Sequence, residues 1–116
     1  MVAFNFKKQF IEAVEEGTKR QTIRAHRKDG RQPKVGDKLQ LYYGMRTKKC
    51  RLLRVAECLK VVDIYINDGG VFMNDTGVGF DRETIAKEDG FDSWREMHAF
   101  FVKEHGLPFE GVLVKW

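Results

Sequence analysis

Lys19 and Thr22 stand three residues apart in the segment EGTKRQTIR, and this pairing of residue types could carry out hydrolysis. A threonine hydroxyl attacks a carbonyl effectively only when a neighbouring base removes its proton. A lysine can be that base if burial or nearby cations lower its pKa from about 10.4. Arg20, between the two residues, and Arg24, just after them, could supply such cations. These residues form the first candidate site.

The path of the backbone decides which of these side chains can meet. Along a regular strand, Lys19 and Thr22 would point to opposite faces, and Arg20, Thr22 and Arg24 would share one face. Gly17 precedes the segment, and glycine permits a bend that would bring Lys19 and Thr22 together. Without the bend, the two arginines and the threonine suit a phosphate-binding strand. Either way, we expect the segment to line a ligand cleft.

A second candidate site follows in the segment YYGMRTKKCR, residues 42–51. Tyr42 and Tyr43 alternate in facing, so we expect one in the core and one available to stack on a base, a contact worth about 1 to 3 kcal/mol. The basic side chains that would contact phosphates are Arg46, Lys48, Lys49 and Arg51. A solvated hairpin tip with one packed tyrosine is the competing interpretation.

The net charge of +4 conceals a strong polarity along the chain. Residues 1–60 contain 16 Lys/Arg and 6 Asp/Glu, whereas residues 61–116 contain 5 and 11, which gives net charges of +10 and −6. A basic region of this density attracts polyanions, above all the phosphates of nucleic acids. We therefore expect a nucleic acid as the partner, with a merely solvated basic face as the alternative.

The elements that must position these sites follow from the periodicity of apolar residues. Phe6, Phe10, Ile11 and Val14 recur at helical spacing, which predicts an N-terminal helix that ends at Gly17. Alternating residues predict strands at 20–24 and 38–43, and residues 50–66 suit one bent strand or two joined strands. A turn at 67–70 should return the chain as a hairpin.

Two helices and a last strand complete the predicted fold. The helices are expected at 82–88 and after the capping-box sequence SWRE at 93–96, and the strand at 111–116. We predict one α+β domain spanning residues 1–116. Its architecture would be a small β-barrel of five or six strands, with the N-terminal helix and the two later helices packed on it.

Composition narrows the class of protein. The chain is 42% apolar and 33% charged, as is usual for globular proteins, and it contains no run of about 20 apolar residues. We expect a cytoplasmic protein, because the N-terminus has the wrong charge order for a secretory signal. We also expect a monomer. Cys50 and Cys58 would lie about 26 Å apart on a strand, too far for a disulfide, and are expected to be reduced and buried. The three histidines form no zinc pattern with them, so we expect neither metal nor cofactor.

Four landmarks occur in order along the chain: G-x-K-x-x-T-I-R at 17–24, K-V-G-D at 34–37, D-G-F-D-S-W at 89–94 before an aromatic helix, and an apolar terminal strand. This ordered set resembles the ASCH domain family of the PUA-like superfamily. Within the family the chain is similar to small single-domain bacterial and phage members, and distantly to the 4-acetylcytidine amidohydrolase. The resemblance spans nearly the whole chain.

The resemblance implies a PUA-like β-barrel whose cleft is lined by the first motif, and a role in RNA binding or nucleoside chemistry. One small bacterial type removes the acetyl group of 4-acetylcytidine with a Thr, Lys and Glu set, and another type is reported as a ribonuclease. The Lys and Thr of that set match Lys19 and Thr22. The acid matches either Asp89, just before Gly90, or Glu88, so both are candidates.

Two classes of function follow. In the first, the domain is a hydrolase that acts on RNA or on an acetylated cytidine and depends on Lys19 and Thr22. In the second, the basic cleft binds RNA without chemistry, and substitution of its cations would weaken binding and flatten its salt dependence.

Overall fold

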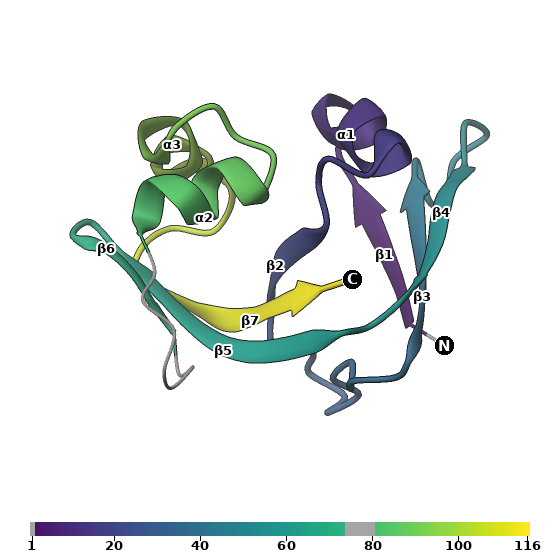
Figure 1. Ribbon diagram of the computed structural model, residues 1–116, viewed down its shortest axis with the longest axis horizontal. Helices are drawn as coiled ribbons and strands as arrows, with labels where there is room; N and C mark the ends of the chain where they lie inside the picture. The colour runs from purple at the N-terminus through teal and green to yellow at the C-terminus, as the bar shows by residue number, and fades with distance from the viewer. Residues whose placement is uncertain (1, 74–80) are drawn as a thin grey trace.

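The computed structural model describes residues 2–73 and 81–116, whose strands form two sheets (Figure 1). The first sheet has the order β1-β3-β4 and contains β1 (Val2–Phe6), β3 (Lys38–Tyr43) and β4 (Arg51–Glu57). The second has the order β2-β7-β5-β6 and contains β2 (Gln21–Ala25), β7 (Phe109–Lys115), β5 (Lys60–Asn67) and β6 (Gly70–Met73). The helices are the 3₁₀ turn η1 (Lys8–Phe10), α1 (Ile11–Glu16), α2 (Arg82–Glu88) and α3 (Trp94–Glu104). The predicted α+β class is confirmed.

The predicted closed barrel is not found among the described residues, because no strand of one sheet pairs with a strand of the other. The chain passes from one sheet to the other at the junction of β4 and β5. Strand β4 passes into β5 through Cys58 and Leu59. Cys58 N–H donates to the Asp37 carbonyl before β3, and Leu59 N–H donates to the Lys115 carbonyl in β7, both at 2.8 Å. The chain thus leaves one sheet and enters the other without joining their hydrogen-bond ladders into a ring.

The N-terminus differs from the predicted helix. Residues 2–6 form the strand β1, which pairs in parallel with β3. Its side chains alternate as in a strand, since Phe4 and Phe6 are buried and the intervening Asn5 is exposed. The helix proper is confined to α1 and ends at Gly17, as predicted. The hairpin of β5 and β6 and the two helices before the last strand are also as predicted. Ser93 caps α3 by accepting from Glu96 N–H at 3.2 Å.

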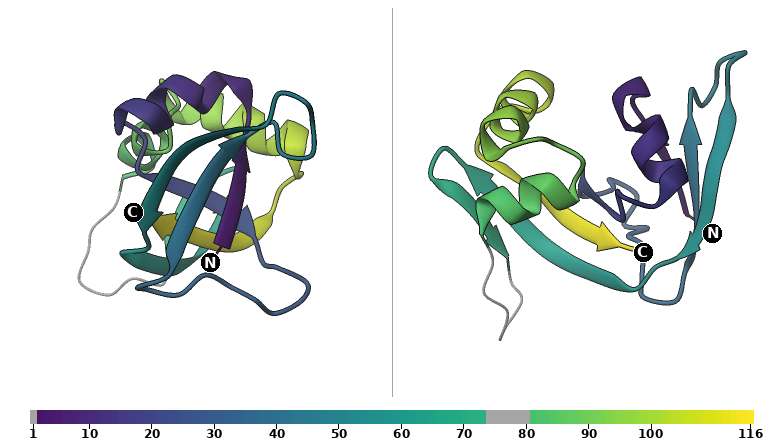
Figure 2. Two further views of the ribbon diagram at one scale, coloured as in Figure 1. Left: turned by 90° about the vertical axis from the view of Figure 1, so that its right-hand side faces the viewer. Right: turned by 45° about the horizontal axis from the view of Figure 1, so that its top comes forward.

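The helices stand on the same side of the two sheets (Figures 1 and 2). Helix α1 lies by the three-stranded sheet, and α2 and α3 lie over the four-stranded sheet. Aromatic rings connect the two groups: the ring centroid of Phe10 lies 5.4 Å from that of Phe91 and 6.1 Å from that of Phe100. The candidate site lies in this region between the helices.

Candidate functional site

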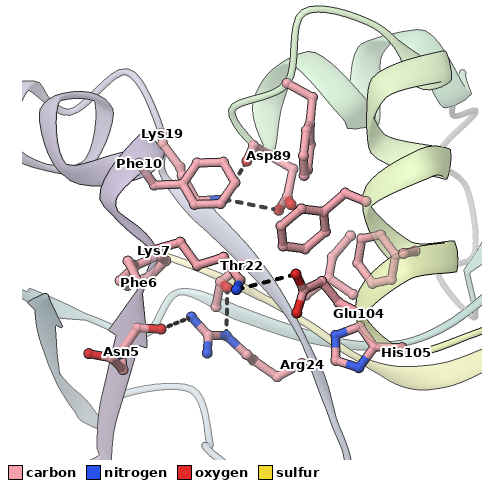
Figure 3. A pocket seen from close by; sticks show the side chains of 14 residues that line it. Asn5, Phe6, Lys7, Phe10, Lys19, Thr22, Arg24, Asp89, Glu104 and His105 are labelled. Carbon is pink, nitrogen blue, oxygen red and sulfur yellow. Dashed lines mark hydrogen bonds and ion pairs between the residues drawn. The ribbon is translucent and has the colours of Figure 1, made fainter. Parts of the chain in front are cut away.

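The chain bends between α1 and β2 as a meeting of Lys19 and Thr22 requires. Gly17 has a left-handed backbone, with φ of 83°, and the N–H groups of Gly17, Thr18 and Lys19 donate to the Ala13 carbonyl at 3.0 to 3.1 Å. Strand β2 begins only at Gln21, so Lys19 is free of the strand's alternation. Lys19 and Thr22 consequently line one pocket, of about 320 Å³ (Figure 3).

The pocket has an apolar, mostly aromatic wall that comes from both halves of the chain. This wall consists of Phe6, Phe10, Ile23, Phe91, Phe100 and Phe101. Two of these rings, Phe100 and Phe101 of α3, also pack in the hydrophobic core. Flat rings of this kind suit a planar, weakly polar ligand.

A buried ion pair joins Lys19 to Asp89, which lies 70 positions later in the chain. Lys19 is 2% exposed and Asp89 5%. Lys19 Nζ lies 3.3 Å from Asp89 Oδ1 and also donates to the Asp89 main-chain carbonyl. An ammonium has three donors, so one remains for the pocket. The same amine lies 4.7 Å from the centroid of the Phe10 ring.

The pKa values of this pair are shifted toward the neutral forms. Burial is the main cause that lowers the pKa of Lys19, and Asp89 opposes this shift while Arg24 adds to it. Burial likewise raises the pKa of Asp89 against the attraction of Lys19. The sequence predicted that burial or nearby cations could lower the pKa of the lysine. Shifts of this kind in a pocket are typical of functional groups.

Gln21 supports the carboxylate of Asp89, a role that the sequence did not predict. Its side chain is 1% exposed, and its amide nitrogen lies 3.3 Å from both Asp89 Oδ1 and the Ile85 carbonyl. Gln21 thereby ties the carboxylate of Asp89 to the end of α2. The only signal in the sequence is an uncharged polar residue at a strand position opposite in facing to Thr22.

Gly90 allows the segment after α2 to approach the N-terminal half closely. Its φ is +95°, and an added Cβ would lie 3.0 Å from Phe10 Cδ1 and 3.2 Å from Lys19 Cδ. A side chain at this position would therefore push Asp89 away from Lys19.

Thr22 and Arg24 alternate correctly along β2 and both line the pocket. Arg24 Nε donates to Thr22 Oγ1 at 2.9 Å, and Arg24 Nη2 donates to the Asn5 carbonyl at 2.8 Å (Figure 3). Because the oxygen of Thr22 accepts from Arg24, its own hydroxyl hydrogen is available to a base or a ligand.

An ion pair crosses the rim of the pocket. Lys7 Nζ lies 3.3 Å from Glu104 Oε1, which connects the start of η1 to the end of α3 (Figure 3). His105 also lines the rim, and burial lowers its pKa. The pocket therefore passes from a buried charged floor to a polar, more exposed mouth.

Glu88 and Arg20 do not line this pocket. Glu88 Oε2 lies 3.2 Å from Lys115 Nζ, and Arg20 Nε donates to the Trp116 carbonyl at 3.2 Å. Both residues line a separate hollow beside β7. Between the two acids that the sequence left open, the geometry places Asp89 with Lys19 and Thr22. Arg20 does not share a strand face with Thr22 and Arg24, as the sequence suggested, because β2 begins only at Gln21.

The basic hairpin segment lies outside the pocket but is attached to its rim. Residues 44–50 form the loop between β3 and β4, which leaves Cys50 exposed rather than buried as predicted, whereas Cys58 is buried. Met45 N–H donates to Asn5 Oδ1 at 2.9 Å, and the main-chain oxygen of Asn5 accepts from Arg24. One residue thus connects the loop to the pocket.

The side chains of this hairpin that were predicted to contact a nucleic acid do not share one surface. The cations of the loop are Arg46, Lys48 and Lys49, and all three are exposed. Arg51 forms an ion pair with Glu15 of α1. In the sheet register, Tyr43 lies opposite the inward-facing Phe6 and Tyr42 lies opposite the exposed Asn5, so Tyr42 takes the outer face and both tyrosines are half-buried.

Within the described residues, no three His, Cys, Asp or Glu side chains are grouped to hold a metal ion. The longest helix of the described part, α3, has 11 residues, and no helix there is long and apolar enough to cross a membrane. Comparison of the chain with protein-family models, with curated proteins and with solved structures found no match.

Proposed function

We propose that the chain is an ASCH-type domain of PUA-like descent whose pocket binds a nucleoside and hydrolyses an acyl amide on its base, as in 4-acetylcytidine. A volume of about 320 Å³ is at the small end of the range for ligand pockets, about 300 to 1,000 Å³, and suits one nucleoside better than a length of RNA. The aromatic wall offers stacking surfaces for a planar base.

The observation that carries this proposal is the convergence of Lys19, Thr22 and Asp89 on one pocket. It supplies a hydroxyl nucleophile, an amine with a lowered pKa and a carboxylate that orients the amine. This is the nucleophile, base and orienting group that an activated hydroxyl requires.

In the proposed reaction, Thr22 Oγ1 bonds to the acetyl carbon while neutral Lys19 takes the hydroxyl proton, and the π electrons of the carbonyl move to its oxygen. The carbon–nitrogen bond then breaks, and the Lys19 ammonium gives that proton to the leaving nitrogen of cytidine. Water attacks the resulting Thr22 ester, with Lys19 again accepting a proton. The ester bond breaks, the proton returns to Thr22, and acetic acid leaves and ionises.

The test is incubation of the protein with 4-acetylcytidine, with cytidine and acetate quantified by chromatography. We expect release of both products by the native chain and a loss of at least about 100-fold in Thr22→Val. Thr18→Val is the matched control, because Thr18 is exposed and its hydroxyl donates to the Ala13 carbonyl, at 3.3 Å, away from the pocket. Absence of cytidine from the native reaction would refute the proposed activity.

RNA binding without chemistry is the second candidate, favoured by the loop cations that Asn5 attaches to the rim. In this case a single-stranded RNA would run from the pocket along the β3–β4 loop. Filter binding at several salt concentrations tests it, since each lost phosphate contact should reduce the slope of log K against log salt by about 0.7. Tight, salt-dependent RNA binding without cleavage or deacetylation would favour this function over hydrolysis.

A further inference from the structure

Arg24 is the cation of the pocket whose charge the described carboxylates leave unpaired. Lys19 is paired with Asp89, and Lys7 with Glu104, each at 3.3 Å. No carboxylate oxygen of residues 2–73 and 81–116 forms an ion pair with Arg24. The charged side chains that line the pocket are therefore three cations and two carboxylates, and with His105 neutral they leave one positive charge uncompensated.

The guanidinium of Arg24 is fixed from several sides. Besides its bonds to Thr22 Oγ1 and the Asn5 carbonyl, its Cζ lies 4.9 Å from the centroid of Phe6 and 5.2 Å from that of Phe4. Burial lowers its pKa to about 10, so it stays protonated at neutral pH. A guanidinium has five N–H donors, so these two bonds leave donors for a ligand.

The contact with Thr22 places this charge where a reaction would develop negative charge. When Thr22 Oγ1 attacks a carbonyl carbon, the oxyanion forms on that same carbon, one bond from the attacking oxygen. A donor 2.9 Å from Oγ1 can therefore reach the oxyanion with little movement. The uncharged substrate gains less from a fixed cation than the charged transition state does, which is the condition for catalysis.

We propose that Arg24 is a catalytic residue that stabilises the oxyanion formed on the acyl group, rather than the phosphate contact that the sequence suggested. The inference rests on the proposed hydrolysis. It also predicts that the site binds acetate, because the carboxylate of the product places its charge where the oxyanion was.

Kinetics of 4-acetylcytidine hydrolysis test the catalytic role. Loss of one oxyanion donor reduces kcat by about 100- to 1,000-fold, and we expect this of Arg24→Met with a much smaller change in KM. Arg27→Met is the matched control: Arg27 also stacks on Phe4, at 5.4 Å, and donates to a β1 carbonyl, but it does not line the pocket. Millimolar guanidinium should restore part of the activity of Arg24→Ala and none of that of Thr22→Val.

Acetate binding to the native protein provides a test that does not depend on turnover. We expect acetate, but not chloride at the same ionic strength, to shift the Arg24 Nε–H signal in NMR spectra and to leave that of Arg27 unchanged. The Arg24→Lys spectrum identifies the signal.

The possible failures are distinguishable. A native enzyme that hydrolyses the substrate while Arg24→Met keeps its kcat, or an Arg24 signal indifferent to acetate, would overturn the role of Arg24 and leave the reaction intact. An acetate response without any hydrolysis would overturn the proposed reaction, and the catalytic role with it, and would leave Arg24 as a carboxylate-binding residue. A purely structural Arg24 predicts a loss of stability with neither guanidinium rescue nor an acetate response.

Discussion

Removal of one partner from the buried Lys19–Asp89 pair should destabilise the fold strongly, whichever partner is removed. Breaking a buried ion pair typically costs about 3 to 5 kcal/mol, because one charge is left without compensation. In Asp89→Asn, Lys19 keeps the main-chain carbonyl of residue 89 as an acceptor. We therefore expect a loss near the lower end, about 3 kcal/mol, for Asp89→Asn and about 4 kcal/mol for Lys19→Met.

The two variants should respond to pH in opposite directions. In Lys19→Met the buried carboxyl of Asp89 has a folded pKa above its unfolded value of about 3.9, so stability is greatest at low pH and falls as the pH rises through the folded pKa. In Asp89→Asn the amine of Lys19 has a folded pKa below about 10.4. Its unfolded state then binds more protons between the two pKa values, so stability rises with pH there.

Urea unfolding followed by circular dichroism, at pH 5, 7 and 9, measures both effects. With an m-value of about 2 kcal/mol/M, a loss of 3 kcal/mol lowers the midpoint by about 1.5 M. The double variant Lys19→Met with Asp89→Leu should be within about 1 kcal/mol of the native chain, because an apolar pair can replace a buried ion pair at little cost. Losses that simply add in the double variant, or single variants with no pH dependence, would refute the coupling inferred from the contact at 3.3 Å.

Three other perturbations test separate parts of the structure. An added Cβ at Gly111 would lie 2.1 Å from the Arg24 carbonyl oxygen, so Gly111→Ala should force β7 away from β2, cost about 3 kcal/mol in urea unfolding and abolish turnover. A Cβ at Gly30 meets nothing within 4 Å, so Gly30→Ala should lose only the roughly 1 kcal/mol that its left-handed backbone (φ +74°) costs an alanine, and should keep its activity. The rim pair of Lys7 and Glu104 is partly exposed, so Lys7→Ala should change the free energy of unfolding by less than about 1 kcal/mol. A loss above about 2 kcal/mol would show instead that this ion pair holds η1 and α3 together. Replacing Arg46, Lys48 and Lys49 by Gln should reduce the salt slope of RNA binding by about 2 and leave hydrolysis of the free nucleoside unchanged; an unaltered slope would exclude the loop as an RNA contact.

Local signals in the sequence predicted local structure well. The Gly17 stop, the Ser93 cap and the turn at 67–70 each depend on a few neighbouring residues, and each is found at its predicted place. The strand β1 was missed because Phe6 also fits the helical spacing of Phe10 and Val14. Only the parallel pairing with β3, more than 30 positions away, decides in favour of a strand, and pairing of this kind has no local signature.

The arrangement of the sheets was also beyond the reach of the sequence. Counting strands predicted a ring, but closure depends on which strands pair across long loops. At the junction of β4 and β5, Cys58 and Leu59 form hydrogen bonds with residues 37 and 115, and no sequence pattern predicts such contacts. The resemblance to the ASCH family thus stays a prediction, as does its barrel.

For the candidate site, the spacing of Lys19 and Thr22 with a preceding glycine was sufficient to predict that both could line one cleft. The choice between Glu88 and Asp89 was not predictable, because adjacent residues at a helix end differ by about 100° in direction. Asp89 is the C-cap of α2 and turns inward to Lys19, while Glu88 turns to Lys115. Gln21 could not be identified because its role depends on where that helix ends.

The buried pair is difficult to explain as a device for stability. Apolar residues of similar volume would satisfy the same space among Phe6, Phe10 and Phe91 at equal or lower free energy. Burial shifts the pKa values of both groups toward their neutral forms, and the same pocket holds a guanidinium that pairs with none of the described carboxylates and lies 2.9 Å from a hydroxyl. A reaction that moves a proton and develops an oxyanion would use each of these groups, which is why we propose a chemical role for the site in addition to packing.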